Sequence, residues 1–237
     1  MKSLLTFLLA IIFTSAFAQN PKLKIKHITG NLYSYKTYNN YKGTLIDANA
    51  VYLVTPKGVV VIDAPWDPTE FQPFLDSIWI KHHQKVVLDI ATHSHGDRAG
   101  GLAFFKSKGI KTYTSTATDQ ILKKNKEPRA QFTFSKDTTF TVGNYKINTY
   151  YAGAGHTKDN LVIWFGKDKV LFGGCLVKSV ESKDLGYIGE ADLPAWPKSI
   201  SKLKQKYPDL KYLVTGHEAW NGKESLDYTL DLLKKKS

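Results

Sequence analysis

Two histidines and an aspartate alternate in the segment 92–97, which reads Thr-His-Ser-His-Gly-Asp. The segment follows directly on the apolar run Val86–Ala91. A short apolar run rich in β-branched residues predicts a buried strand, and the residues after a strand lie at the rim of its sheet, where loops build sites. Imidazole and carboxylate groups bind metal ions. The spacing of His93, His95 and Asp97 therefore predicts a metal site at a strand end.

Three further residues of ligand type lie downstream, and each follows an apolar segment: His156, Cys175 and His217. Imidazole and thiolate are donors that suit Zn²⁺, and a catalytic zinc keeps one coordination position open for water. Six ligands are too many for one tetrahedral ion with an open position. They divide into three ligands for each of two zinc ions.

Each of these residues also has a plainer interpretation. A lone His-x-His pair occurs by chance on surfaces, His156 lies in a glycine-rich turn, and His217 could cap a strand. Cys175 alone would more often be a small buried hydrophobe. The recurrence of ligand residues at several strand ends favours metal binding over these alternatives. In an extended segment His93, His95 and Asp97 would share one face, whereas in a turning loop Asp97 could reach a second ion.

The elements that position these residues occur in the same order in both halves of the chain. A predicted hairpin over 52–62 is followed by a helix that Asp67 caps, with Pro68 in its first turn, and then by the strand 86–91. In the second half, a hairpin over 161–172 precedes a helix that opens at Pro197 and a strand over 212–215. Two such units, packed sheet against sheet with helices outside, predict a four-layer αβ/βα sandwich.

The amino terminus has the layout of a secretory signal peptide. Lys2 precedes an apolar run over 4–13, and small residues at Ala16 and Ala18 form a cleavage site. We expect cleavage after Ala18, a periplasmic protein, and one domain over 19–237. The apolar run is shorter than the ~20 residues that a membrane span needs, so no membrane anchor is expected. We also expect a monomer.

Charge and cysteine content narrow the function classes. The formal net charge is +12, from 33 basic and 21 acidic residues, but the lysines are spread along the chain. We therefore do not expect a nucleic-acid partner. Cys175 is the only cysteine. An unpaired cysteine in an exported protein is unusual, and its position after an apolar strand favours a thiolate ligand.

The order of the motifs resembles a known family over essentially the whole mature chain. The blocks are His-Ser-His-Gly-Asp-Arg-Ala-Gly-Gly at 93–101, Gly-His-Thr-Lys-Asp-Asn at 155–160, Gly-Gly-Cys-Leu-Val-Lys at 173–178 and Gly-His at 216–217. Together they resemble a class B metallo-β-lactamase of the first, di-zinc subclass. The resemblance implies the αβ/βα fold and two zinc ions. One zinc would be held by His93, His95 and His156, the other by Asp97, Cys175 and His217.

The resemblance also implies an activity: opening the β-lactam ring of penicillins, cephalosporins and carbapenems, and so antibiotic resistance. A zinc-bound hydroxide held by the metal ligands would be the nucleophile, since zinc lowers the pKa of bound water from ~15.7 to ~7. Asp97 would ligate its zinc and orient the nucleophile. Lys178 would pair with the carboxylate of the β-lactam substrate. Tyr187 lies in a substrate-binding segment where the family usually has an asparagine.

Two expectations concern the surroundings of the site. Residues 38–44 are rich in Asn, Gly and Tyr, which predicts a long hairpin loop, and the corresponding region of the family is a flap over the substrate. Trp66 is expected to belong to the core.

Other hydrolases of the same superfamily typically read His-x-His-x-Asp-His. This chain has Arg98 after Asp97 and Cys175 as a later ligand, which favours the lactamase subclass over thioesterases and nucleases. Two alternatives stay open: a zinc hydrolase of the superfamily that acts on another ester, thioester or lactone, and a periplasmic zinc-binding protein without catalysis.

Overall fold

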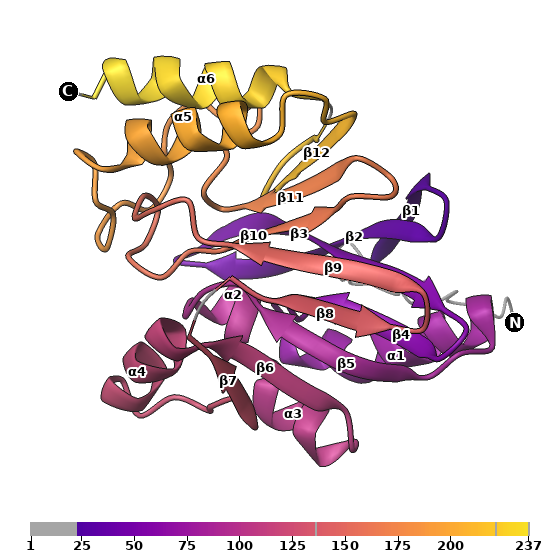
Figure 1. Cartoon of the computed structure of the whole chain (residues 1–237). Coiled ribbons are helices and arrows are strands. Elements are labelled where there is room, and N and C mark those ends of the chain that lie inside the picture. Colours follow the sequence, from indigo (N-terminus) through magenta and orange to yellow (C-terminus); the bar gives the residue numbers. More distant parts are fainter. Residues whose placement is uncertain (1–22, 136, 221, 237) are drawn as a thin grey trace, which may run out of the picture.

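Two β-sheets face each other in the computed structural model, which describes residues 23–135, 137–220 and 222–236 (Figure 1). The first sheet has the order β1-β2-β3-β4-β5-β6-β7, with β1 (Lys24–Thr29), β2 (Leu32–Tyr41), β3 (Thr44–Thr55), β4 (Gly58–Ile62), β5 (Val86–Ala91), β6 (Lys111–Ser115) and β7 (Phe132–Phe134). The second has the order β12-β11-β10-β9-β8, with β8 (Thr139–Val142), β9 (Tyr145–Tyr150), β10 (Val162–Phe165), β11 (Val170–Gly174) and β12 (Tyr212–Thr215).

Helices cover the outer faces of the two sheets, which makes four layers (Figure 1). The outer helices are α1 (Phe71–His82), α3 (Leu102–Ser107), α4 (Thr116–Lys124), α5 (Trp196–Lys206) and α6 (Glu224–Lys234). The short η1 (Pro68–Glu70) precedes α1, and α2 (Gly96–Ala99) lies at the rim. The predicted αβ/βα sandwich is therefore confirmed.

The repeated order of elements predicted from the sequence is present. The antiparallel pair β3 and β4 leads through α1 into β5, which runs parallel to β4. In the second half, antiparallel β10 and β11 lead through α5 into β12, which runs parallel to β11. In each half the helix returns the chain across its sheet. As a result β5 and β12 deliver the residues that follow them to the same rim of the molecule.

The core between the sheets is built from β-branched and aromatic side chains of both. Val60 and Ile90 from the first sheet pack with Ile163, Phe172 and Val214 from the second. Neighbouring residues on the same strands face the helix layer instead. Buried on both faces, β4 and β5 carry the continuous apolar runs that made them recognisable in the sequence.

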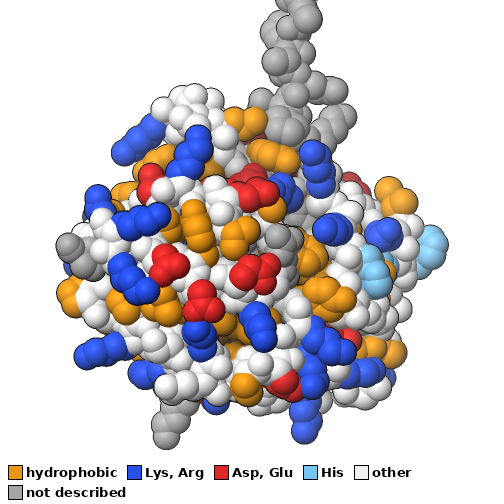
Figure 2. Space-filling view, turned by 90° about the horizontal axis from the view of Figure 1, so that it is seen from above, with side chains coloured by type: hydrophobic (Ala, Val, Ile, Leu, Met, Phe, Trp, Pro, Cys, Tyr) orange, Lys and Arg blue, Asp and Glu red, His pale blue; other side chains and the backbone are white. Residues whose placement is uncertain are grey.

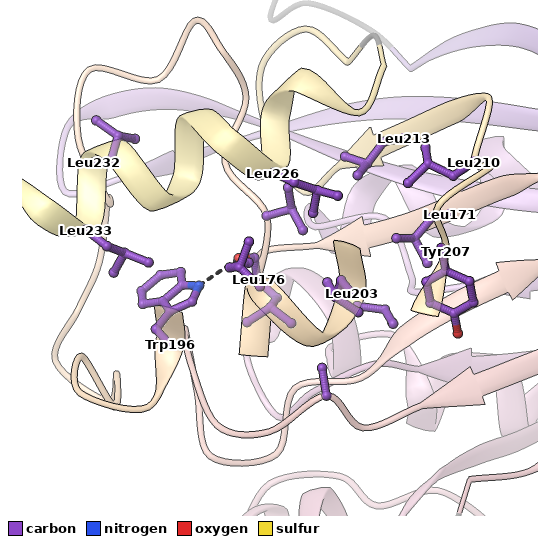
Figure 3. Close-up of a cluster of buried hydrophobic side chains, with 14 of the residues drawn as sticks. Leu171, Leu176, Trp196, Leu203, Tyr207, Leu210, Leu213, Leu226, Leu232 and Leu233 are labelled. Atoms are coloured by element: carbon purple, nitrogen blue, oxygen red, sulfur yellow. Dashed lines mark hydrogen bonds between the residues drawn. The ribbon is translucent and has the colours of Figure 1, made fainter. Parts of the chain in front are cut away.

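Amphipathic helices close the outer layers. On the second sheet, α5 and α6 contribute Trp196, Leu203, Leu226 and Leu233 to one buried cluster (Figure 3). The Trp196 indole Nε1 donates to the backbone oxygen of Leu176 at 2.8 Å. That bond ties α5 to the segment that follows Cys175. The helix layer therefore helps to fix the position of a predicted ligand.

The structure corrects two local predictions. Asp67 does act as an N-cap, accepting from the backbone N–H of Thr69, but the element it caps is η1, and α1 begins at Phe71. Residues 38–44 are not a long loop, because β2 continues to Tyr41 and β3 starts at Thr44. Lys42 and Gly43 both have positive φ, as a two-residue hairpin turn requires. The predicted flap is thus a long, regular β-hairpin.

The surface carries its charges in a mixed pattern. The face seen from above in Figure 2, on the side of α5 and α6, shows basic side chains interleaved with acidic and apolar ones. Within the described part of the chain, no helix is both long and apolar enough to cross a membrane. The predicted signal peptide, 1–18, lies outside the described residues.

Candidate metal centre

All six predicted ligands lie at the rim where strands of both sheets end. His93 follows β5, Cys175 follows β11, and His217 follows β12. His156 lies in the loop between β9 and β10. After His95 the chain turns into the short helix α2, which carries Asp97 in its first turn. A turn therefore separates Asp97 from the two histidines, and the three residues do not share one face of an extended strand. Of the two arrangements left open by the sequence, the observed one is the turning loop, in which Asp97 could reach a second ion.

Three histidines form one half of the site. The ring centroids of His93, His95 and His156 are 4.9 to 5.3 Å apart, and the three residues could hold one metal ion. His95 Nδ1 and His156 Nε2 are 3.2 Å apart, and His93 Nε2 is buried without a hydrogen-bond partner among the described residues. Burying several nitrogen lone pairs close together with no hydrogen-bond donor costs free energy. A bound cation would remove that cost by accepting the lone pairs.

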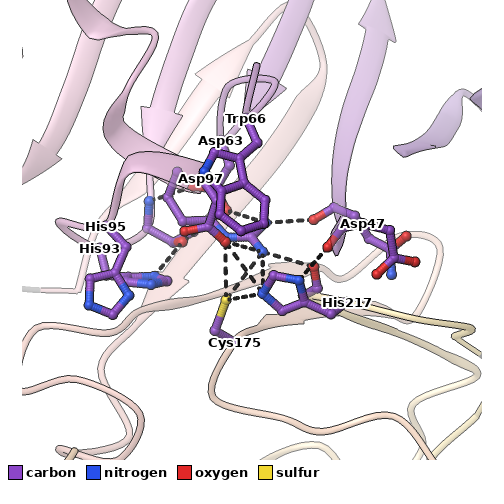
Figure 4. A network of polar contacts seen from close by, with 12 residues as sticks. Asp47, Asp63, Trp66, His93, His95, Asp97, Cys175 and His217 are labelled. Carbon is purple, nitrogen blue, oxygen red and sulfur yellow. Dashed lines mark hydrogen bonds and ion pairs between the residues drawn. The ribbon is translucent and has the colours of Figure 1, made fainter. Parts of the chain in front are cut away.

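Asp97, Cys175 and His217 form the other half (Figure 4). The Cys175 sulfur lies 3.3 Å from His217 Nε2 and 3.7 Å from Asp97 Oδ2, and Asp97 Oδ2 lies 3.4 Å from His217 Nε2. His93, Asp97 and Cys175 also come close enough together to hold an ion. The two halves therefore adjoin. Nitrogen, sulfur and carboxylate oxygen are together a donor set that fits zinc.

The electrostatics of the three-histidine half favour ligation. Burial, assisted by the neighbouring histidines and by Lys178, holds the pKa values of His93 and His156 well below the usual range. Both imidazoles are therefore neutral at pH 7. A neutral imidazole has a lone pair free for a metal ion, whereas an imidazolium does not.

The second half combines opposite charges. Burial alone would raise the pKa of Asp97, but the Arg98 guanidinium and His217 outweigh it and hold that pKa well below its usual range. For His217 the effects are reversed: burial would lower the pKa of the imidazole, but the Cys175 sulfur and the Asp97 carboxylate raise it to about 10. Without metal, His217 thus carries the proton that a bound cation would displace.

Arg98 is a functional residue whose role the sequence did not indicate. Its fully buried guanidinium donates to the Cys175 sulfur at 3.2 Å and pairs with Asp97 at 2.9 Å. It also donates to the backbone oxygens of Asn49 and Gly216. From the sequence alone, Arg98 only distinguishes the lactamase subclass from other hydrolases of the superfamily. In the fold it lies against the second half of the site, where its guanidinium offsets the charge of Asp97.

Two carboxylates next to the site were also missed. Glu190 accepts from His95 Nε2 at 3.0 Å, which leaves Nδ1 of that ring facing His156. Asp63, at the end of β4, accepts from both the backbone N–H and the hydroxyl of Thr92, the residue before His93. Asp63 has a positive φ of 64° directly after a strand, but no sequence pattern marks such a conformation. Glu190 lies in an irregular segment that offered no signal.

A cavity of about 870 Å³ opens over the site. Its floor includes His95, Asp97, His156 and His217, and one wall comes from the β2–β3 hairpin and Trp66. The Trp66 ring lies edge-on to His217 with centroids 6.1 Å apart, and its side chain is only partly buried. The expectation that Trp66 belongs to the core was therefore wrong. Trp66 follows β4, its backbone N–H donates to the Thr37 hydroxyl on β2, and its side chain lines the cavity beside the hairpin.

Lys178 and Tyr187, the two residues expected from the sequence to bind substrate, also line this cavity. Lys178 is only 7% exposed, and burial lowers the pKa of its ammonium group. Tyr187 is half exposed, and its ring centroid lies 5.7 Å from that of His95. Candidate metal ligands, a buried lysine and aromatic side chains thus line one cavity.

Comparison with known proteins places this site in a family. A family model described as the metallo-beta-lactamase superfamily matches residues 43–217. The metallo-beta-lactamase type 2 of Elizabethkingia meningoseptica is 50% identical over 98% of this chain and 94% of its own length. The metallo-beta-lactamase IND-1 of Chryseobacterium indologenes is 43% identical over the full length of both chains.

Solved structures agree with the sequence relatives. The crystal structure of the metallo-beta-lactamase IND-7 superposes with a TM-score of 0.88 at 43% identity, covering 91% of this chain and 100% of the other. A metallo-beta-lactamase from Pontibacter korlensis gives a TM-score of 0.87 at 34% identity, covering 90% and 99%. The chain belongs to the metallo-β-lactamase superfamily. Within it, the resemblance to the first subclass of class B, which the sequence motifs indicated, is confirmed.

Proposed function

We infer that this protein is a zinc-dependent hydrolase that opens the β-lactam ring of antibiotics and so confers resistance. The observation that carries this conclusion is the pair of adjoining ligand groups on the floor of one cavity, with the Lys178 ammonium group in its wall. The curated relatives that match almost the whole chain are named metallo-β-lactamases. They do not favour a hydrolase of other esters or a storage protein.

The proposed ligand sets follow the two halves of the site. His93, His95 and His156 would hold one Zn²⁺, and Asp97, Cys175 and His217 the second. When bound, zinc supplies a water of lowered pKa, about 7, and a Lewis acid for the lactam carbonyl oxygen. The residues of the chain supply the remainder of the chemistry, which consists of orientation, charge and exclusion of bulk water.

Asp97 and Lys178 have distinct proposed roles. Asp97 is ionised beside Arg98, so its carboxylate can accept a hydrogen bond from the attacking water and orient it. The Lys178 ammonium group lies near Gly186, where a methyl group would come within 3.8 Å of it, and 5.6 Å from the centre of the Trp196 ring. Largely desolvated, it would pair strongly with the carboxylate that β-lactam antibiotics carry.

The proposal makes two separate measurements decisive. Zinc-loaded protein should hydrolyse a chromogenic cephalosporin and lose this activity in a chelator. Elemental analysis should find two zinc ions in the wild type and about one in Cys175→Ser, since a hydroxyl is a poor zinc ligand. If fully loaded protein leaves the lactam intact, the activity is wrong. If Cys175→Ser keeps both ions, the ligand assignment is wrong.

We further propose that the chain is exported to the periplasm, that cleavage follows Ala18, and that residues 19–237 act as one monomeric metallo-β-lactamase domain. The proposal is supported by the order of Lys2, the apolar run and the small residues in the sequence. Amino-terminal sequencing of protein from the periplasmic fraction should begin at Gln19, and light scattering should give the mass of one chain.

A further inference from the structure

One aromatic side chain in the cavity has an orientation that a glycine makes possible. A methyl group at Gly189 would lie 2.5 Å from the Tyr187 hydroxyl oxygen and 2.7 Å from ring carbon Cζ. Both distances are shorter than real contacts, so any larger residue at 189 would displace the Tyr187 ring. The ring is therefore held with its hydroxyl end against the backbone of Gly189 and within edge-to-face distance of His95.

Tyr187 nevertheless presents part of its ring to the cavity. The side chain is 50% exposed, one of the most exposed large hydrophobic side chains of the described residues. Tyr41 and Leu45 of the β2–β3 hairpin line the same cavity and are 40% and 45% exposed. The centroids of the Tyr41 and Trp66 rings are 6.2 Å apart. The cavity thus has partly exposed apolar surface on Tyr187 and on the hairpin.

The position of Lys178 decides which part of a substrate meets Tyr187. A β-lactam carries its carboxylate on the nitrogen side of the lactam carbonyl and its variable side chain on the other side. Suppose that Lys178 binds the carboxylate of the substrate and that the lactam carbonyl lies over the candidate metal ligands. The variable side chain of the substrate then extends past the three-histidine half of the site. His95 belongs to that half, and Tyr187 is the aromatic residue that contacts its ring.

We propose that Tyr187 is a specificity-determining residue that packs against an aromatic side chain of the substrate, and that Gly189 sets the orientation of its ring. This proposal rests on the proposed β-lactamase activity and on the proposed role of Lys178. An aromatic side chain would gain an aromatic contact and cover exposed ring surface, whereas a small aliphatic side chain would not reach it. The aromatic contact is worth about three- to tenfold in binding.

The test uses two penicillins that differ only in the acyl group, phenylacetyl or acetyl. Tyr187→Ala should lower kcat/KM for the phenylacetyl compound about three- to tenfold, mainly through KM, and leave the acetyl compound within about twofold. Tyr187→Phe should behave as the wild type, since the ring is retained. Gly189→Ala should reduce the preference in the same direction, because it moves the ring without removing it.

Controls separate this role from general damage. Tyr212→Ala removes an exposed tyrosine at the start of β12, the end of the strand remote from His217, and should change neither substrate. All variants should keep the zinc content of the wild type. An equal loss for both penicillins in Tyr187→Ala, or no loss for either, would overturn the proposal. A zinc-loaded wild type that opens neither penicillin would overturn the proposed function and this role with it.

Discussion

The guanidinium of Arg98 donates to the sulfur of Cys175 across 3.2 Å, although the two residues are 77 positions apart in the chain. Both side chains are buried. The same guanidinium pairs with Asp97 at 2.9 Å and lies 3.5 Å from Asp63. Arg98 therefore contacts three buried groups at once and offsets the charge of the Asp97 carboxylate.

Removing Arg98 should destabilise the fold as well as the site. Arg98→Ala leaves buried carboxylates uncompensated, which costs about 3 to 5 kcal/mol in the free energy of unfolding. Denaturant titration of the metal-free protein should detect this loss. Arg98→Lys keeps the positive charge but loses the planar guanidinium group. Its free energy of unfolding should therefore lie between those of the wild type and Arg98→Ala.

Arg129 provides the matched control for that experiment. It pairs with Asp119 in an ion pair that leaves its own side chain 48% exposed. Arg129→Ala should therefore lower the free energy of unfolding much less than Arg98→Ala does, because the ion pair is exposed to solvent. Equal losses in the Arg98 and Arg129 variants would contradict the role assigned to Arg98.

Glu190 should control how firmly His95 is held. Its carboxylate accepts from His95 Nε2, which orients the ring and leaves Nδ1 for the metal. Glu190→Ala should weaken zinc binding or activity about 10- to 100-fold, as the loss of such a partner usually does. Competition with a chromophoric chelator measures the affinity. Glu181→Ala, an exposed glutamate in the same connecting segment, should leave it unchanged.

Asp89 should make the protein less stable as the pH rises. Burial, and secondarily the charge of Asp63, raises the pKa of this carboxyl well above its usual range, and neither oxygen has a partner among the described residues. Below pH ~4 the group is protonated in both the folded and the unfolded state, so it adds no pH dependence to the stability. Above that pH only the unfolded state ionises freely, so stability falls by up to about 1.4 kcal/mol per pH unit until the folded-state pKa is passed.

Asp89→Asn should remove that pH dependence. The variant should gain stability over the wild type progressively from pH 5 to pH 8, as measured by urea unfolding at each pH. Asp76→Asn, on the exposed face of α1, is the control and should not show such a gain. A constant difference between Asp89→Asn and the wild type at all pH values would contradict a neutral, buried Asp89.

The single thiol should report on metal occupancy. Cys175 is the only cysteine in the chain and is 2% exposed. In zinc-loaded protein its sulfur is a proposed ligand and should react slowly with a thiol reagent. After chelation the reaction should speed up and reach one label per chain, because the sulfur is no longer held by the metal. Equal rates with and without the chelator would argue against ligation by Cys175.

Much of the site could be predicted from the sequence because its information is local. The apolar strands that end at Ala91 and Thr215 are read from runs of four to six residues, and the ligands follow them directly. The repeated order of hairpin, helix and strand then predicts that the candidate ligands of both halves lie at the same rim of the molecule. Such short-range patterns can be recognised in the sequence because they reflect the periodicity of strands and helices.

Only the tertiary structure decided which groups meet. Glu190 reaches His95 across 95 positions, and no local pattern marks either as a partner of the other. The hairpin beside Trp66 was expected to be a loop, because residues 38–44 are rich in Asn, Gly and Tyr. The sequence by itself determined the candidate ligands and the layers that carry them. The tertiary structure decided which charged groups lie beside the candidate ligands and what lines the cavity, since those contacts depend on side chains brought together from distant strands.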